Sequence, residues 1–232
     1  MSRLQSELQR LYGSHSPAGA DSAAAAKGQV QAVVLELARP ADWTVLSRLW
    51  RGVQADLNLP APAIAVNGID GFQLWFSLPA PMSAAQARAF VDALRMRYLR
   101  DIPNDRLRIT PAIDAMPPQP TLEGQWSSFV AADLAPVFAD EPWLDLPPGE
   151  DGQADVLCRL ERIKSADFRV ALERLVIADT APPVSVALTA DSAGLDPERF
   201  LRQVLNDESV ALGLRIEAAK ALLPLSGYRR RD

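Results

Sequence analysis

The sequence predicts an α+β fold, in which a split βαβ (ferredoxin-like) antiparallel sheet is followed by a mainly helical C-terminal part. Two observations predict it. Between residues 29 and 110, apolar and amphipathic segments follow one another in the order strand, helix, strand, strand, helix, strand, which places both helices on one face of a four-stranded sheet. After residue 152, apolar residues recur mainly at helical spacing, so this part is expected to be helical.

Four segments have the composition of strands, because they are short and rich in β-branched and aromatic residues. They span residues 30–37, 59–66, 72–78 and 106–110. The second and third are separated by the sequence NGIDG, in which asparagine and glycine tolerate the positive φ angles of a tight hairpin. We therefore expect the four strands to pair in one sheet.

Two amphipathic segments lie between these strands. The first covers residues 41–57, and its stripe consists of Trp43, Leu46, Trp50, Val53 and Leu57. The second begins at Ser83, which can form a capping box with Gln86. Each has one apolar side, so both helices are expected to pack on the same face of the sheet.

The alternation along the strands divides their side chains between two faces. The third strand must turn Phe72, Leu74 and Phe76 toward the helices. The opposite face is expected to be open and to carry Glu36, Gln73, Trp75, Ser77, Arg106 and Arg108. This set suits a nucleotide, because arginine pairs with phosphate, an indole stacks on a base and a carboxylate holds a magnesium ion.

A structural interpretation of the same face is the alternative. Glu36 would pair with Arg106 or Arg108, and Trp75 would be covered by hydrophobic surface of the later helices. The C-terminal half needs a surface on which to dock, and this face is the obvious candidate.

The middle of the chain is acidic. Between residues 109 and 158 there are nine acidic residues and no lysine or arginine, in a chain of formal net charge -5. Trp126, Phe129, Phe138 and Trp143 interrupt this segment and indicate that it packs against the fold. Its charge suits a basic protein partner and repels nucleic acid, so a protein-interaction adaptor is the rival function.

These patterns divide the chain into four parts. Residues 1–28, rich in Gly, Ser and Ala, are expected to be a flexible arm beyond a short first helix. The sheet domain follows over 29–118, then an acidic, proline-rich connection over 119–151 and a helical domain over 152–232. Cys158 is expected to be a buried, unreactive thiol on the apolar side of a helix.

The composition excludes several classes of protein. A single cysteine and a single histidine, His15, exclude a disulfide framework and the commoner zinc sites. The sequence contains no Gly-rich phosphate-binding loop, no apolar run long enough to span a membrane and no apolar signal segment at its start. A cytoplasmic protein without a membrane partner is therefore expected.

The segments VVLELARPADW and AVNGIDGFQLWFSL, followed by a long helix, resemble the core of archaeo-eukaryotic primase-type polymerases over residues 30–114. The resemblance implies that Glu36 stands at a metal-binding acid, Gln73 at a nucleotide-contacting histidine and Asp114 at a final acid. It thus implies binding of nucleotide or nucleic acid, with a magnesium ion held by Glu36 and Asp114. Ala38 replaces the second acid of the metal site, so the two-metal clamp is incomplete and polymerase activity is not expected.

Two further interpretations stand beside this one. Residues 200–224 are similar to helical tails of phage packaging proteins and other mobile-element proteins, which implies a replication or mobile-element setting. A hydrolase or nucleotidyltransferase that combines Glu36 with acids from residues 114–155 is the third candidate function.

Overall fold

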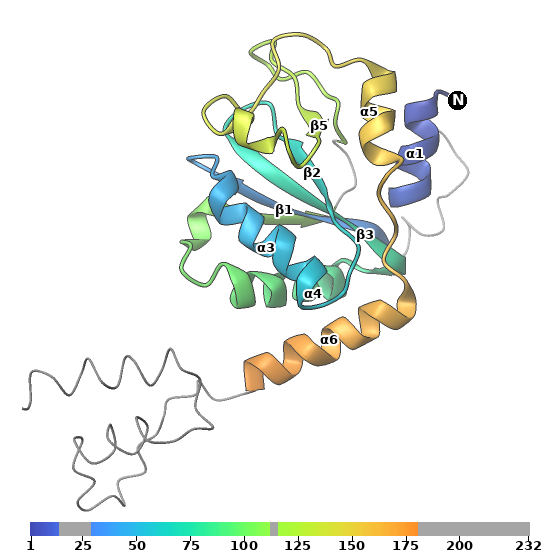
Figure 1. Ribbon diagram of the computed structural model, residues 1–232, viewed down its shortest axis with the longest axis vertical. Coiled ribbons are helices and arrows are strands. Elements are labelled where there is room, and N and C mark those ends of the chain that lie inside the picture. Colours follow the sequence, from blue (N-terminus) through green and yellow to red (C-terminus); the bar gives the residue numbers. More distant parts are fainter. Residues whose placement is uncertain (14–28, 112–115, 181–232) are drawn as a thin grey trace, which may run out of the picture. The chain divides into compact units, whose positions relative to one another are not determined.

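Five antiparallel strands make one sheet, in the order β4-β1-β3-β2-β5 (Figure 1). The computed structural model describes residues 1–13, 29–111 and 116–180. Its strands are β1 (Gln29–Ala38), β2 (Ala63–Val66), β3 (Gly71–Ser83), β4 (Leu107–Pro111) and β5 (Ser128–Val130). The first four have the order of a split βαβ sheet, so the predicted α+β class is confirmed. His15, Asp114 and residues 200–224 lie outside the described residues.

Five helices and two short 3₁₀ turns surround the sheet in the described part of the chain. They are α1 (Arg3–Tyr12), α3 (Trp43–Ala55), α4 (Ala84–Tyr98), η1 (Asn104–Arg106), η2 (Ala135–Phe138), α5 (Glu150–Leu157) and α6 (Ser165–Thr180). The predicted capping box at the start of α4 is present, since the Ser83 hydroxyl accepts a bond from the backbone N–H of Gln86 and the Gln86 side-chain oxygen accepts one from the backbone N–H of Ser83. None of the described helices is long and apolar enough to cross a membrane.

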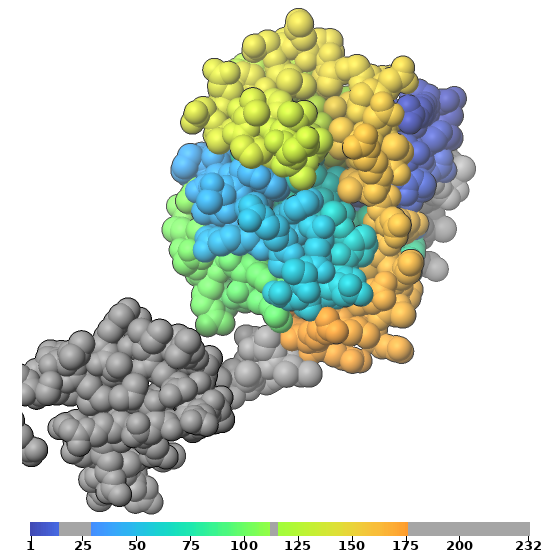
Figure 2. Space-filling view, viewed as in Figure 1, coloured from blue at the N-terminus to red at the C-terminus, as the bar shows by residue number. Residues whose placement is uncertain are grey.

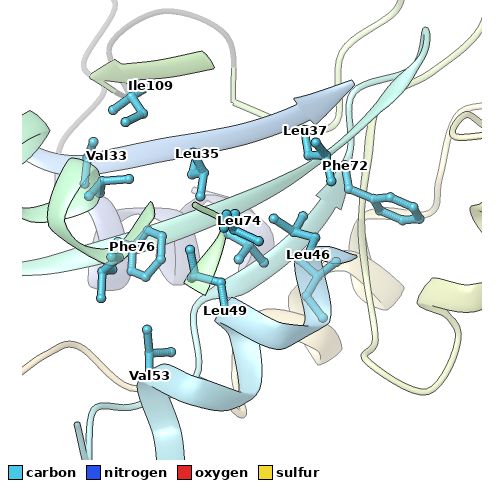
Figure 3. Close-up of a cluster of buried hydrophobic side chains, with 14 of the residues drawn as sticks. Val33, Leu35, Leu37, Leu46, Leu49, Val53, Phe72, Leu74, Phe76 and Ile109 are labelled. Carbon is cyan, nitrogen blue, oxygen red and sulfur yellow. The ribbon is translucent and has the colours of Figure 1, made fainter. Parts of the chain in front are cut away.

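The first face of the sheet carries the main hydrophobic core, under α3, α4 and α6 (Figure 3). Phe72, Leu74 and Phe76 of β3, which were predicted to face the helices, are buried here. Buried with them are the side chains of the neighbouring strands that point to the same face: Val33, Leu35, Leu37 and Ile109. Leu46, Leu49 and Val53 of α3 pack against them. Phe168 of α6 meets Phe90 of α4, with the ring centroids 4.9 Å apart. The predicted assignment of side chains to the two faces is therefore confirmed.

The second face is covered by α1 and α5, which lie side by side (Figure 1). Leu11 and Tyr12 of α1 and Leu157 of α5 are buried in a cluster with the strand residues of this face. Arg10 joins the two helices, because its guanidinium donates to the carbonyl oxygens of Leu157 and Leu160, both at 2.9 Å. The expectation of an open face is therefore wrong. The structural alternative is confirmed in part, since α5, one of the later helices, covers this face together with α1.

The expected division into domains also needs correction. Residues Met1–Thr180 form one compact unit, separate from Ala181–Asp232. The first helix belongs to this unit and not to a free arm over 1–28. The segment 119–151, expected to be a connection, contributes β5 to the sheet. The boundaries at 118 and 151 therefore do not separate domains. β5 escaped prediction because it is only 3 residues long and lies in a segment dominated by acids and prolines.

Candidate functional site

Trp75 and Ser77, predicted to lie on an exposed binding face, are both buried. The Trp75 ring packs against both Tyr12 and Phe129, with centroid distances of 5.6 and 5.7 Å, and those two rings stack on each other. The Ser77 hydroxyl donates to the carbonyl oxygen of Leu11 at 2.7 Å. Because α1 and β5 occupy the space in front of the indole, no nucleobase can stack on it in this structure.

Glu36 and Gln73 are half-buried and bonded to each other. The Gln73 amide donates to the Glu36 carboxylate at 2.7 Å, and the Trp75 indole N–H donates to the Gln73 amide oxygen at 2.9 Å. Both ends of the Gln73 amide are therefore engaged. Among the described residues, Glu36 forms no ion pair with either Arg106 or Arg108, so that part of the structural alternative is not observed.

The two predicted arginines have different environments. Arg106 belongs to η1, not to β4, and its guanidinium donates to the carbonyl oxygens of Ala38 at 3.3 Å and Pro40 at 2.8 Å. Arg108 lies on β4 directly across from Glu36 and is exposed. Of the two, Arg108 alone forms no hydrogen bond or ion pair through its side chain within the described residues, as phosphate binding requires.

Metal ligands do not gather in the part of the chain that the structure describes. No group of three or more His, Cys, Asp or Glu side chains is placed to hold an ion there. Cys158, expected to be buried, is exposed at the C-cap of α5. The helix ends at Leu157, and the Cys158 thiol donates to the carbonyl oxygen of Asp155 at 3.3 Å instead of packing in the core.

The acidic segment is folded onto the sheet, and we call its residues 116–158 the acidic layer. Gln153 of α5 fixes it from inside, because its side-chain amide bonds both the N–H of Phe129, at 2.8 Å, and the carbonyl of Phe129, at 3.0 Å. This side chain takes the place of a neighbouring strand on β5. The hairpin turn is tied to the same layer, since the Gly68 N–H donates to the Pro142 carbonyl oxygen at 3.0 Å.

All eight acidic residues of the layer are exposed. They are Glu123, Asp133, Asp140, Glu141, Asp145, Glu150, Asp151 and Asp155. Within the described residues, only Asp155 takes part in an ion pair, with Arg3 at 2.7 Å. Figure 2 shows the layer, coloured lime to yellow, gathered at one end of the described unit. This end therefore carries a negative potential that no cation of the layer offsets.

The acidic layer also exposes large hydrophobic side chains. Eight such side chains are exposed in the described part of the chain, and four of them lie in the layer: Leu122, Leu134, Val137 and Leu146. The acidic surface could be predicted from the charge pattern of the sequence. The exposure of these four apolar residues could not be predicted from their spacing. Exposed apolar residues among like charges are typical of surfaces that bind other proteins.

No protein-family model matches the chain, and no curated protein matches it.

Proposed function

We propose that this protein is a protein-interaction module that binds a basic partner through the acidic layer. One observation carries the proposal: a segment bonded to the fold by buried hydrogen bonds presents eight acids and four large apolar side chains to solvent. Burial of these apolar side chains against a partner would give roughly 1.5–3 kcal/mol each. The acids would guide the partner and exclude acidic competitors.

The experiment compares three forms of the full chain in a titration with the peptide acetyl-Arg-Arg-Leu-Arg-Arg-amide. One variant carries Asp140→Asn, Glu141→Gln and Asp145→Asn in the layer. The matched control carries Asp105→Asn, Glu161→Gln and Glu173→Gln, which remove three exposed acids outside it. We expect wild type and control to bind in the micromolar to millimolar range, and the layer variant to bind several-fold more weakly.

Salt supplies a second test of the same proposal. Attraction between exposed charges is screened over about 8 Å at physiological ionic strength, so binding by wild type should weaken several-fold between low and high salt. The affinity of the layer variant should fall less over the same change in salt, because it has three fewer charges. Equal binding by all three forms, or no binding by any, would contradict the proposal.

The second candidate function is the primase-like one, nucleotide or nucleic-acid binding without polymerase activity. It is supported by a polar row across three strands, since Glu36 pairs in register with Gln73 on β3 and with Arg108 on β4. Burial of Trp75 and Ser77 removes the stacking surface from that site. The acidic layer therefore receives more support than the sheet face.

A further inference from the structure

A pocket of about 440 Å³ opens beside the acidic layer, at the point where β5 stops pairing with β2. The last pair of this ladder joins Ile64 to Val130. Beyond it the chain leaves the sheet through residues 131–133, while β2 begins at Ala63, directly after Pro62. Residues of both segments line the pocket.

The pocket is closed to a further strand. Pro62 has no backbone N–H to donate, and its carbonyl oxygen accepts a hydrogen bond from the indole N–H of Trp50 at 3.1 Å. The side chain of Gln153 already occupies the outer hydrogen-bonding groups of Phe129 on β5. A partner cannot add a strand at this edge, so the space suits a side chain instead.

The walls of the pocket are mainly apolar. They are formed by Trp50 of α3, Ile64 and Val130 of the sheet, and Val156 and Leu160 in and after α5. Asp133 and Asp155 also line it and are exposed. Arg159 is the only cation among the lining residues.

We infer that this pocket is the anchor site of the acidic layer and takes one large apolar side chain of the basic partner, flanked by lysine or arginine. The inference rests on the proposed function. The apolar walls accept the side chain, and the exposed Asp133, which forms no ion pair within the described residues, lies where it attracts a cationic neighbour. Asp155 on the same rim already pairs with Arg3. A single side chain buried in a pocket and surrounded by charged contacts is the usual arrangement of an energetic hot spot.

The test adds a second peptide, acetyl-Arg-Arg-Ser-Arg-Arg-amide, to the titration of the full chain. The two peptides carry the same charge and differ only in the central side chain. We expect the leucine peptide to bind about tenfold more tightly than the serine peptide, because the leucine leaves water. The indole N–H signal of Trp50 in the NMR spectrum, assigned with Trp50→Phe, should shift with the leucine peptide only.

Variants that fill the pocket provide the controls. Ala131→Phe and Val156→Trp each enlarge a half-buried lining residue and should reduce the preference for leucine to less than about twofold. Ala85→Phe, at an exposed position of α4, should leave the preference unchanged. Two filling variants on different elements guard against the misfolding of one of them.

The outcomes separate the inference from the function on which it rests. If both peptides bound wild type equally and the layer variant more weakly, the anchor pocket would be overturned. The acidic docking surface, which includes Asp140, Glu141 and Asp145, would still be supported. A leucine preference that persists in both filling variants would place the anchor elsewhere and overturn the inference. Failure of both peptides to bind would overturn the docking surface and the anchor together.

Discussion

The two faces of the sheet are closed in different ways. The first is covered by α3 and α4, which connect strands that follow one another in the sequence, together with α6. The second is covered by α1 and α5, whose joining contacts span 147 and 150 residues of sequence. Alternation within a strand shows that two faces exist, but it does not show what covers them. A face that bears glutamate, glutamine and serine can still be an interior surface.

The covering layers also differ in what holds them. The first face depends on close packing of aliphatic and aromatic side chains (Figure 3). The second depends in addition on a few polar contacts, which are buried at Gln153 and part-buried at Arg10 and Gln73. We therefore expect mutations of the first face to act through lost volume and mutations of the second to act through lost hydrogen bonds.

The largest effects should come from the aromatic residues on the two sides of β3. Phe76→Ala should lower the free energy of unfolding by about 3–5 kcal/mol, and Trp75→Ala by a similar amount, because both side chains are buried. Chemical denaturation of the two variants measures this. If Trp75→Ala remained within about 1 kcal/mol of wild type, the second face would be open after all.

A smaller loss is expected from Gln153→Met, which keeps the volume of the side chain but removes its hydrogen bonds to β5. Two backbone groups of Phe129 would lose their partner, at a cost of about 2–4 kcal/mol. The same measurement on Gln9→Met, at an exposed position of α1, serves as the control. Equal stability of the two variants would show that the acidic layer is not held through Gln153.

Arg10→Met should cost less, about 1–2 kcal/mol, because Arg10 is partly exposed and its bonds are shared with water. Its loss leaves the carbonyl oxygens of Leu157 and Leu160 without the guanidinium. Hydrogen exchange should become faster in α1 and α5 while α3 and α4 keep their rates. Uniform acceleration over all four helices would contradict separate closure of the two faces.

The smallest effect concerns ionisation of Tyr98, at the edge of the first face. Partial burial, together with the bond that its hydroxyl donates to Asp56, raises its pKa to about 12. A tyrosine with a raised pKa stabilises the fold below pH 10, and this contribution is lost as the pH rises through 12. The pKa of Tyr98 can be measured from the difference in phenolate absorbance between wild type and Tyr98→Phe during a pH titration. A midpoint of this difference near pH 10 would contradict the prediction.

Tyr12 gives the matching observation on the second face. Its burial raises the pKa of the phenol more strongly than at Tyr98. The difference spectrum of wild type minus Tyr12→Phe should therefore show no phenolate until the protein unfolds. Ionisation of Tyr12 in the folded protein would mean that α1 leaves the sheet.

Much of the fold could be predicted from the sequence because its signals are local. The hairpin at Asn67 and Gly68, the capping box at Ser83 and the alternation around Phe76 each depend on a few neighbouring residues. Two features depend on contacts between segments that are distant in the sequence: the packing of α1 against Trp75 and the hydrogen bonds of Gln153 to β5. Local sequence patterns do not predict such contacts. For the candidate site, the charge of the acidic layer was visible in the sequence, whereas its exposed leucines and its pocket were not.

The central claim is that the second face of the sheet is interior and that binding occurs at the acidic layer. The most direct measurement follows the indole N–H of Trp75 by NMR, assigned with Trp75→Phe, while ATP and then single-stranded DNA are added at low salt. We predict no shift of this signal with either ligand and slow exchange of its proton with solvent. A shift that saturates with ligand and disappears in Arg108→Gln would contradict the account and favour a nucleotide site on the sheet.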